Sequence, residues 1–309
     1  MKYIFFGTPE FSAIVLDKLI SANYIPEAVI CNQDEPVGRK QILTPPPAKV
    51  LAEKFNVRVF QPEKLRDNSK FAEQLKNLKP DLAIVAAYGK AIPKTILDIF
   101  KSGAINVHAS LLPAYRGASP IQHAILNGDK KTGVTIMKID EEIDHGPIIS
   151  SVKIQISNED TLESLSQKLA ISGAELLIKI FPDYIGGKLK PVIQDHTKAT
   201  FAKIIKKEDG KISWLKSAGE IERMTRAFYP WPAAWAIWNN KILKIIKADS
   251  VGGNNHETGE IFLINKKELA VKCRGGNLII ENLQLEGGKI LSAKEFLNGH
   301  KDFIGSVLK

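Results

Sequence analysis

Short apolar runs alternate with longer amphipathic stretches through the first half of the chain. This alternation is typical of βαβ units around a parallel sheet, whose strands are buried and therefore apolar on both faces. The expected strands are residues 2–6, 27–31, 58–60, 82–86, 104–107 and 134–139. Helical spacing predicts helices over residues 12–20, 47–55 and 71–78. Because βαβ crossovers are right-handed, these helices would cover the two faces of the sheet, and we expect an open, mostly parallel α/β domain.

A long helix and a polar stretch follow this domain. The helix is expected to begin after Asp160 or Thr161 as its N-cap and to end at Gly186–Gly187, with its leucines in the core. Residues 188–200 are polar and lack periodicity, which indicates a linker. The predicted division is a domain of residues 1–187, a linker of residues 188–206 and a domain of residues 207–309.

The C-terminal domain is predicted to be a small, OB-like β-barrel. One helix is expected at residues 217–228. The strands predicted after it are residues 234–238, 242–248, 259–265, 269–271 and 278–285. Turn residues such as Gly252–Gly253 and Gly275–Gly276 separate them. Several short strands with this punctuation suggest a barrel, and five of them suit an OB-like one.

Length and charge narrow the class of protein. With 309 residues and 44% hydrophobic content, the chain can bury a core in each of two domains. Its net charge is +9, and residues 201–309 hold 18 Lys and Arg against 12 Asp and Glu. Such a bias favours a polyanionic partner, although a solvated lysine-rich surface has the same composition.

Cysteine, histidine and glycine patterns exclude several kinds of site. Cys31 and Cys273 have no spacing partner, so no disulfide framework is expected and a reducing cytoplasm fits. The histidines lack the spacings of metal sites, so we expect no metal. Residues 7–10 lack the glycine pattern of a dinucleotide-binding loop. No signal sequence, membrane span or leftover apolar stripe is present, so we expect a monomer with no membrane partner.

Two residues at the end of a predicted strand are the strongest candidates for chemistry. Asn106 and His108 are two positions apart, so in a regular strand their side chains project from the same face. Ligands of open parallel sheets bind at the carboxyl ends of the strands, which puts an amide and an imidazole where a substrate would lie. An isolated Asn-x-His is more simply explained as a buried, hydrogen-bonded pair, so the choice depends on the neighbouring residues.

Those neighbouring residues resemble a known family. The segment Asn106-x-His108-x-Ser110–Leu111–Leu112–Pro113, continued by residues 116–122 and by residues 140–147, is similar to the signature of the folate-dependent formyltransferases. The resemblance implies a catalytic trio of Asn106, His108 and Asp144. It also implies contacts to the tetrahydrofolate from Ser110, Leu111, Leu112, Pro113, Tyr88 and Gly89.

Further matches extend the resemblance over both predicted domains. Residues 6–11, 87–93 and 226–232 look like the members of this family that formylate initiator methionyl-tRNA. The resemblance implies a Rossmann-like catalytic domain, an OB-like C-terminal domain that grips tRNA, and 10-formyltetrahydrofolate as the formyl donor. The basic residues then expected to contact tRNA are Arg39, Lys40, Lys206 and Lys207.

The expected chemistry explains why these residue types belong together. A neutral amine attacks the formyl carbon, and the carbonyl oxygen becomes an oxyanion. Asn106 would donate an uncharged N–H to that oxygen, and His108 an N–H whose bond strengthens as charge develops. Asp144, as a carboxylate close to His108, would favour the imidazolium and relay the amine's proton through water towards the folate nitrogen.

Two features depart from the family's pattern. The long loop after the second strand, which in the family reaches the tRNA acceptor end, looks one residue shorter here, has Glu35 where a basic residue is common, and lacks a Gly after Arg39. His145 stands where a Thr more often follows the catalytic Asp. Its imidazole would either lower the pKa of Asp144 or compete with His108 for that carboxylate.

Three other functions fit part of the sequence. A formyltransferase acting on a nucleotide-linked amino sugar would keep Asn106, His108 and Asp144 but need a pocket in place of a basic tRNA surface. A non-catalytic nucleic-acid-binding protein would explain the basic C-terminal part and leave those three residues without a purpose. A nicotinamide oxidoreductase would explain the sheet but not the missing glycine fingerprint.

Overall fold

The computed structural model describes residues 1–38, 40–253 and 256–309. Within them the chain forms two compact units, each assembled from three stretches of sequence. The first unit contains Met1–Pro120, Lys131–Gln155 and Ser164–Ala202, and the second contains Ile121–Lys130, Ile156–Glu163 and Lys203–Lys309. The predicted domain limits stay a prediction, and Arg39, a predicted tRNA contact, lies outside the described residues.

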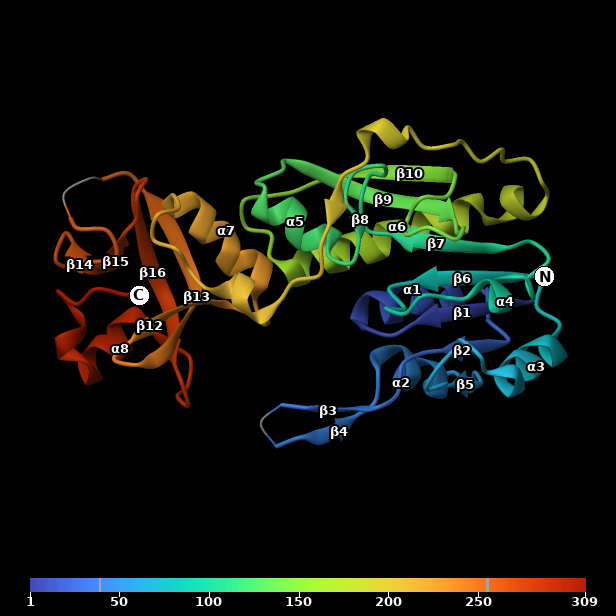
Figure 1. Cartoon of the computed structure of the whole chain (residues 1–309), viewed down its shortest axis with the longest axis horizontal. Coiled ribbons are helices and arrows are strands. Elements are labelled where there is room, and N and C mark those ends of the chain that lie inside the picture. The colour runs from blue at the N-terminus through green and yellow to red at the C-terminus, as the bar shows by residue number, and fades with distance from the viewer. Residues whose placement is uncertain (39, 254–255) are drawn as a thin grey trace. The chain divides into compact units, whose positions relative to one another are not determined.

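A mostly parallel sheet forms the centre of the first unit (Figure 1). Its strand order is β10-β9-β7-β6-β1-β2-β5. These strands are β1 (Tyr3–Gly7), β2 (Ala28–Ile30), β5 (Val59–Phe60), β6 (Leu82–Ala86), β7 (Ala104–His108), β9 (Lys131–Lys138) and β10 (Ile148–Gln155). Strands β1, β2, β5, β6 and β7 run parallel, whereas β9 is antiparallel to β7 and β10 to β9. The predicted α/β fold is confirmed, and β10 is an edge strand that was not among the predicted ones.

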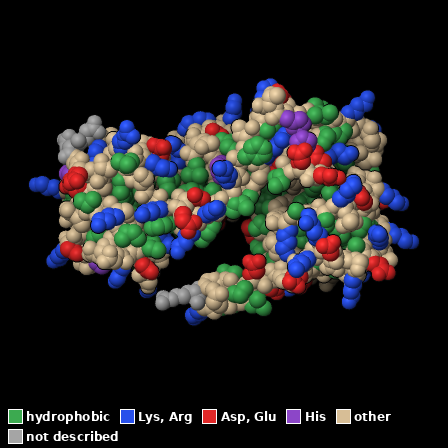
Figure 2. Space-filling view, viewed as in Figure 1, with side chains coloured by type: hydrophobic (Ala, Val, Ile, Leu, Met, Phe, Trp, Pro, Cys, Tyr) green, Lys and Arg blue, Asp and Glu red, His purple; other side chains and the backbone are tan. Residues whose placement is uncertain are grey.

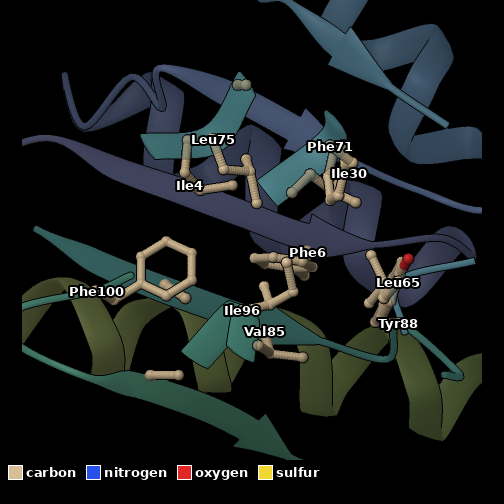
Figure 3. Packing of buried hydrophobic residues seen from close by; sticks show 13 residues of the cluster. Ile4, Phe6, Ile30, Leu65, Phe71, Leu75, Val85, Tyr88, Ile96 and Phe100 are labelled. Atoms are coloured by element: carbon tan, nitrogen blue, oxygen red, sulfur yellow. The ribbon is translucent and has the colours of Figure 1, made fainter. Parts of the chain in front are cut away.

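Helices cover both faces of this sheet. They are α1 (Glu10–Ser21), α2 (Pro47–Lys54), α3 (Ser69–Leu78), α4 (Lys94–Leu97) and α6 (Leu162–Ile185). On one face, Phe71 and Leu75 of α3 and Ile96 of α4 pack with alternate residues of β1, β2 and β6, as Figure 3 shows. On the other face, Phe181 of α6 meets Tyr3 edge to face, because successive residues of a strand point to opposite sides. Each large apolar side chain buried in this way contributes about 1.5–3 kcal/mol.

The carboxyl ends of the parallel strands meet at one edge of the sheet. Thr8 follows β1, Asn32 lies after β2, and Tyr88 lies after β6. The Thr8 hydroxyl donates to the Tyr88 carbonyl oxygen at 3.2 Å, and the Asn32 N–H donates to the Thr8 hydroxyl at 3.2 Å. These bonds join the connecting loops at the edge where β7 ends with His108.

The long loop after β2 forms a hairpin of β3 (Glu35–Val37) and β4 (Ile42–Thr44). Figure 2 shows hydrophobic side chains on the surface of this hairpin, and the residues that are more than half exposed include Val37, Ile42 and Leu43. At its base, the Asp34 carboxylate accepts from Lys49 Nζ at 2.9 Å and from Gln61 Nε2 at 2.7 Å. The Lys49 and Gln61 donors lower the pKa of Asp34. The hairpin is therefore anchored at its base through charged and amide groups.

Residues 188–202, expected to lie in a linker, pack on the first unit. Val192 pairs with Ile148 through two backbone bonds of 2.8 Å. Further along, β11 (Phe201–Ala202) runs parallel to β8 (Arg116–Gly117). The stretch has no periodicity because its contacts are made by backbone groups and by single side chains. By their contacts within the structure, these residues group with the first unit.

An antiparallel sheet forms the centre of the second unit, in the order β12-β13-β16-β15-β14 with β17 beside β16. The strands are β12 (Ala234–Trp238), β13 (Lys241–Val251), β14 (Ile261–Ile264), β15 (Glu268–Lys272), β16 (Asn277–Leu285) and β17 (Leu291–Ser292), and the helices include α5 (Pro120–Leu126), α7 (Ala218–Phe228) and α8 (Ala293–Gly299). A capping box begins α7, because Ser217 Oγ accepts the Glu220 N–H while the Glu220 carboxylate accepts the Ser217 N–H. The predicted C-terminal domain of short β-strands is confirmed, and its sheet is antiparallel. No helix in the described ranges combines the length and apolar character needed to cross a membrane.

Candidate active site

The three side chains of the implied catalytic trio meet at the end of β7. Asn106 Nδ2 donates to Asp144 Oδ1 at 3.2 Å, and His108 Nδ1 lies 3.4 Å from the same oxygen. Asn106 and His108 share a face of β7, and Asp144 lies in the loop after β9, the antiparallel neighbour of β7. The structure therefore brings together residues that are up to 38 positions apart in the sequence.

Backbone geometry fixes the direction of the Asp144 side chain. Its φ is 50°, in the left-handed region that Asp tolerates better than most L residues. Its Oδ2 accepts the Gly117 N–H at 2.8 Å. Two residues later, a Cβ on Gly146 would lie 2.0 Å from the Lys138 carbonyl oxygen, so the loop passes β9 at a distance that only glycine permits. The loop is held on both sides of Asp144.

His108 lies between two acceptor oxygens. Its Nε2 is 3.0 Å from the Tyr115 carbonyl oxygen, and its Nδ1 faces Asp144. The side chain is 6% exposed, so water reaches little of the ring. A neutral imidazole has one N–H and satisfies only one of these acceptors, whereas the imidazolium satisfies both. The ring therefore bridges the Tyr115 carbonyl oxygen and the Asp144 carboxylate.

One buried threonine ties the implied folate-binding turn to β9. The Thr135 hydroxyl donates to the Ser110 carbonyl oxygen at 2.7 Å and accepts the Leu112 N–H at 3.1 Å. Ser110 is buried, and its own hydroxyl donates to the Ala114 carbonyl oxygen, just after the turn, at 2.6 Å. The partly exposed members of the turn are Leu111 and Pro113. Ser110 therefore shapes the turn, and its neighbours form the surface.

Tyr88 and Gly89 lie at the neighbouring strand end. The Tyr88 ring packs edge to face on Phe6, and burial raises the pKa of its hydroxyl to about 12. Its carbonyl oxygen accepts from the side chains of Thr8 and Asn32. Gly89 is exposed and has a φ of 82°. Tyr88 contributes to this edge through its backbone, since its hydroxyl is inside the core.

The His145 ring pairs with an acidic side chain other than Asp144. Its Nδ1 is 2.7 Å from Asp140 Oδ2, and its ring stacks on His196 with centroids 4.1 Å apart. Within the described residues, the ion pair of Asp144 is with His108 and those of His145 are with Asp140 and Glu142. The same described ranges contain no group of three or more His, Cys, Asp or Glu side chains arranged to hold a metal ion.

Two buried residues that were not predicted support Asp144. Gln194 Nε2 donates to the carbonyl oxygens of Asp144 and Gly146, and Gln194 Oε1 accepts from Arg116. Arg116 belongs to the quoted motif, but Gln194 lies in the stretch expected to be a linker. Its partners are 48, 50 and 78 positions away, and no periodicity or spacing marks it in the sequence.

The described residues among the expected tRNA contacts are exposed lysines. Lys40 lies in the turn of the hairpin. In the second unit, Lys206 and Lys216 line a hollow of about 720 Å³, and Lys207 and Lys244 line another of about 300 Å³. Figure 2 shows Lys and Arg side chains spread over the visible surface rather than gathered in one patch.

Comparison with known proteins covers almost the whole chain. The model of the formyl transferase domain matches residues 1–181, and that of the formyl transferase C-terminal domain matches residues 204–301. A methionyl-tRNA formyltransferase of Caldicellulosiruptor saccharolyticus is 46% identical over 314 aligned positions that cover 100% of both chains. A methionyl-tRNA formyltransferase of Halalkalibacterium halodurans is 42% identical and covers 100% of this chain and 98% of its own.

Solved structures share the fold at lower identity. HypX from Aquifex aeolicus in complex with tetrahydrofolic acid has a TM-score of 0.67 at 16% identity, over 98% of this chain and 48% of that one. An N-formyltransferase from Helicobacter canadensis, in complex with folinic acid and dTDP-3-aminofucose, has a TM-score of 0.66 at 21% identity, over 91% of this chain and 98% of that one. Because both domain models match in order and relatives align along the full length, this chain belongs to the formyl transferase family.

Proposed function

We propose that the chain transfers the formyl group of 10-formyltetrahydrofolate to the free amino group of initiator methionyl-tRNA. The observation that carries the proposal is the joining of Asn106 and His108 through one oxygen of Asp144, at the strand end where ligands of such sheets bind. Full-length similarity to methionyl-tRNA formyltransferases supports the choice of acceptor. With this function, we expect the chain to act as a monomer in the cytoplasm.

In the proposed reaction, the amino nitrogen of the methionyl group attacks the formyl carbon. The new C–N bond forms, the carbonyl oxygen takes negative charge, and the bond from the formyl carbon to the folate nitrogen then breaks. Asn106 is half-buried and uses one amide N–H on Asp144, which leaves the other for the oxyanion. His108 supplies a second donor beside it. These two groups stabilise the charge without a metal ion.

Asp144 and His108 provide the path for the proton. The attacking amine must lose one proton and the folate nitrogen must gain one, so the reaction needs no further reactant. Asp144 Oδ1 is within 3.4 Å of both Asn106 Nδ2 and His108 Nδ1. From this position the carboxylate accepts the amine's proton through water and passes it to the departing folate nitrogen.

The turn of residues 110–113 forms one side of the proposed folate site. Thr135 fixes its backbone from within, so Leu111 and Pro113 present a stable apolar surface to a flat ring system. Backbone groups of Tyr88 and Gly89 line the adjacent strand end. Ser110 and Leu112 act by holding the shape of the turn, because both are buried.

Exposed lysines supply the proposed contacts to tRNA. Lys206 and Lys207 are exposed at the start of the second unit's C-terminal stretch, where basic residues outnumber acidic ones. Lys40 would add a contact from the hairpin. Arg39 stays a predicted contact outside the described residues. Each phosphate that a lysine neutralises releases counterions, so binding should weaken steeply with salt.

A transfer assay tests the acceptor. Purified protein with labelled 10-formyltetrahydrofolate is offered charged initiator methionyl-tRNA, a nucleotide-linked amino sugar, or neither. We expect label on the tRNA alone, at a subsaturating rate that falls steeply between about 50 and 200 mM salt. Label on the sugar alone would assign the other acceptor, and transfer to neither would leave a binding function only.

Substitutions in the trio test the site. His108→Ala and Asp144→Ala should keep the fold and lower kcat about 10²–10³-fold, the usual effect of losing one preorganised group at an oxyanion site. Asn106→Ala should lower kcat while the KM values of both substrates change little. Asp98→Ala, at an exposed carboxylate of the same unit, is the control and should leave turnover unchanged. Near-normal turnover in all three trio variants would remove the assignment.

A further inference from the structure

Gln194 is a buried amide whose donors and acceptor are all used. Its side chain belongs to a residue that is 4% exposed. Nε2 donates to the carbonyl oxygen of Asp144 at 2.9 Å and to that of Gly146 at 2.7 Å, while Oε1 accepts from Arg116 at 2.7 and 3.2 Å. A flipped amide would turn its N–H groups towards the guanidinium and its oxygen towards two carbonyl oxygens. The bonding therefore permits a single orientation.

The carbonyl groups that Gln194 bonds lie in the loop that carries the Asp144 carboxylate. They belong to residues on either side of His145, in a loop that has a left-handed residue at Asp144 and a close approach at Gly146. By bonding both oxygens with one nitrogen, Gln194 fixes the rotation of the two peptide units. The Cα–Cβ bond of Asp144 then points its carboxylate between Asn106 and His108.

Arg116 links the same amide to the second side of the carboxylate. It directly precedes Gly117, whose N–H donates to Asp144 Oδ2 at 2.8 Å. The Arg116 residue is 4% exposed, and its guanidinium also contacts His196 Nδ1 at 2.8 Å. Gln194 is thus bonded both to the loop that carries the carboxylate and to Arg116, the residue next to the Gly117 N–H that donates to the carboxylate.

We propose that Gln194 is a positioning residue for the formyl transfer, acting through the backbone of Asp144. The inference rests on the proposed function, and it extends the site to a stretch of chain that contributes no catalytic residue. If Gln194 is lost, the carboxylate loses its fixed direction while the trio stays present. Misplacing a reacting group by about 1 Å is enough to slow a reaction on the order of 10²-fold.

The substitution Gln194→Glu separates positioning from structural support. A carboxylate keeps the acceptor for Arg116 and adds opposite charge, so the buried guanidinium stays paired. It cannot donate to the carbonyl oxygens of Asp144 and Gly146, and it places negative charge against them. The Asp144 loop must move, while the remainder of the network stays bonded.

In the labelled-formyl assay with methionyl-tRNA, Gln194→Glu should lower kcat on the order of 10²-fold. The KM for tRNA should stay close to the wild-type value. The thermal midpoint should fall, because the carbonyl oxygens of Asp144 and Gly146 lose their donor. Thr197→Ala, at an exposed position of the same stretch whose hydroxyl bonds to Asp195, is the matched control and should leave kcat unchanged. In an Asp144→Ala background, adding Gln194→Glu should not lower the residual kcat further, because the two act as a unit.

A second readout is independent of activity. Amide hydrogen exchange at Gly117, whose N–H is bonded to Asp144, should rise in Gln194→Glu and stay at the wild-type level in Thr197→Ala. Wild-type kcat in Gln194→Glu, a further full loss in the double variant, or unchanged Gly117 exchange would each overturn the inference. A wild-type protein that formylates no tRNA would instead refute the proposed function, and Gly117 exchange would still decide whether Gln194 positions Asp144.

Discussion

Thr135→Val breaks the connection between β9 and the turn of residues 110–113. Valine has the shape of threonine without its hydroxyl, so the Ser110 carbonyl and the Leu112 N–H lose their partner beside a residue that is 0% exposed. Each unpaired buried group costs about 1–3 kcal/mol, and with partial relaxation of the turn we expect a loss of roughly 2–4 kcal/mol. At about 2–4 °C per kcal/mol for a unit of this size, the unfolding midpoint should fall by roughly 4–16 °C.

Thermal unfolding and steady-state kinetics measure the two consequences of this change. Because the turn is the proposed folate site, the KM for 10-formyltetrahydrofolate should rise while the KM for tRNA stays the same. Thr44→Val, on exposed β4, removes a hydroxyl that donates to a carbonyl in contact with water, and its midpoint should stay near the wild-type value. An unchanged midpoint in Thr135→Val would refute the view that this threonine ties down the turn, and an unchanged folate KM would separate the turn from the folate site.

Three further substitutions or reagents test other parts of the structure. Gly146→Ala forces the Asp144 loop away from β9 and should lower kcat by on the order of tenfold or more. Gly299→Ala is the control, because an added Cβ there meets no atom within 4 Å, and it should have no effect on kcat. Equal kcat values in the two variants would contradict the prediction. Lys49→Gln removes the ion pair at the base of the hairpin and should raise the KM for tRNA alone, with Lys54→Gln on the same helix as the control. Burial raises the pKa of Cys31 to about 12, so its thiol should resist a disulfide reagent at about pH 8 until urea is added. Because the thiol loses its proton more easily in the unfolded chain, the folded state should lose stability as pH rises from about 8.5 towards 12. Rapid labelling of the native thiol would show that Cys31 is not shielded.

The strands that could be predicted from sequence are those whose burial is continuous. Residues 82–86 were predicted as a strand and form β6, because a central parallel strand is apolar at every position. Strand β10 was missed because it lies at the edge of the sheet, where Ser151, Lys153 and Gln155 face solvent. Such a strand has the composition of a loop, and only its pairing with β9 identifies it.

The site could be predicted as far as local motifs and the family resemblance reach. Asn106 and His108 share a strand face, and that geometry follows from their spacing. The partner of His145 could not be inferred from its place next to Asp144. The direction of its ring depends on the left-handed backbone conformation of Asp144, which the sequence does not reveal. Gln194 could not be predicted for another reason. Its hydrogen-bond partners are far away in the sequence, and a polar residue in a polar stretch gives no sign that it is buried.

The late position of Gln194 in the chain also has a meaning for synthesis on the ribosome. A nascent chain that has reached residue 187 already contains Asn106, His108 and Asp144, but neither Gln194 nor β11. Gln194, the residue proposed to position the carboxylate, follows Asp144 by 50 positions. With the proposed role of Gln194, a fragment ending at residue 187 would contain every strand of the central sheet and all three residues of the trio, but it would lack the amide that holds the Asp144 loop.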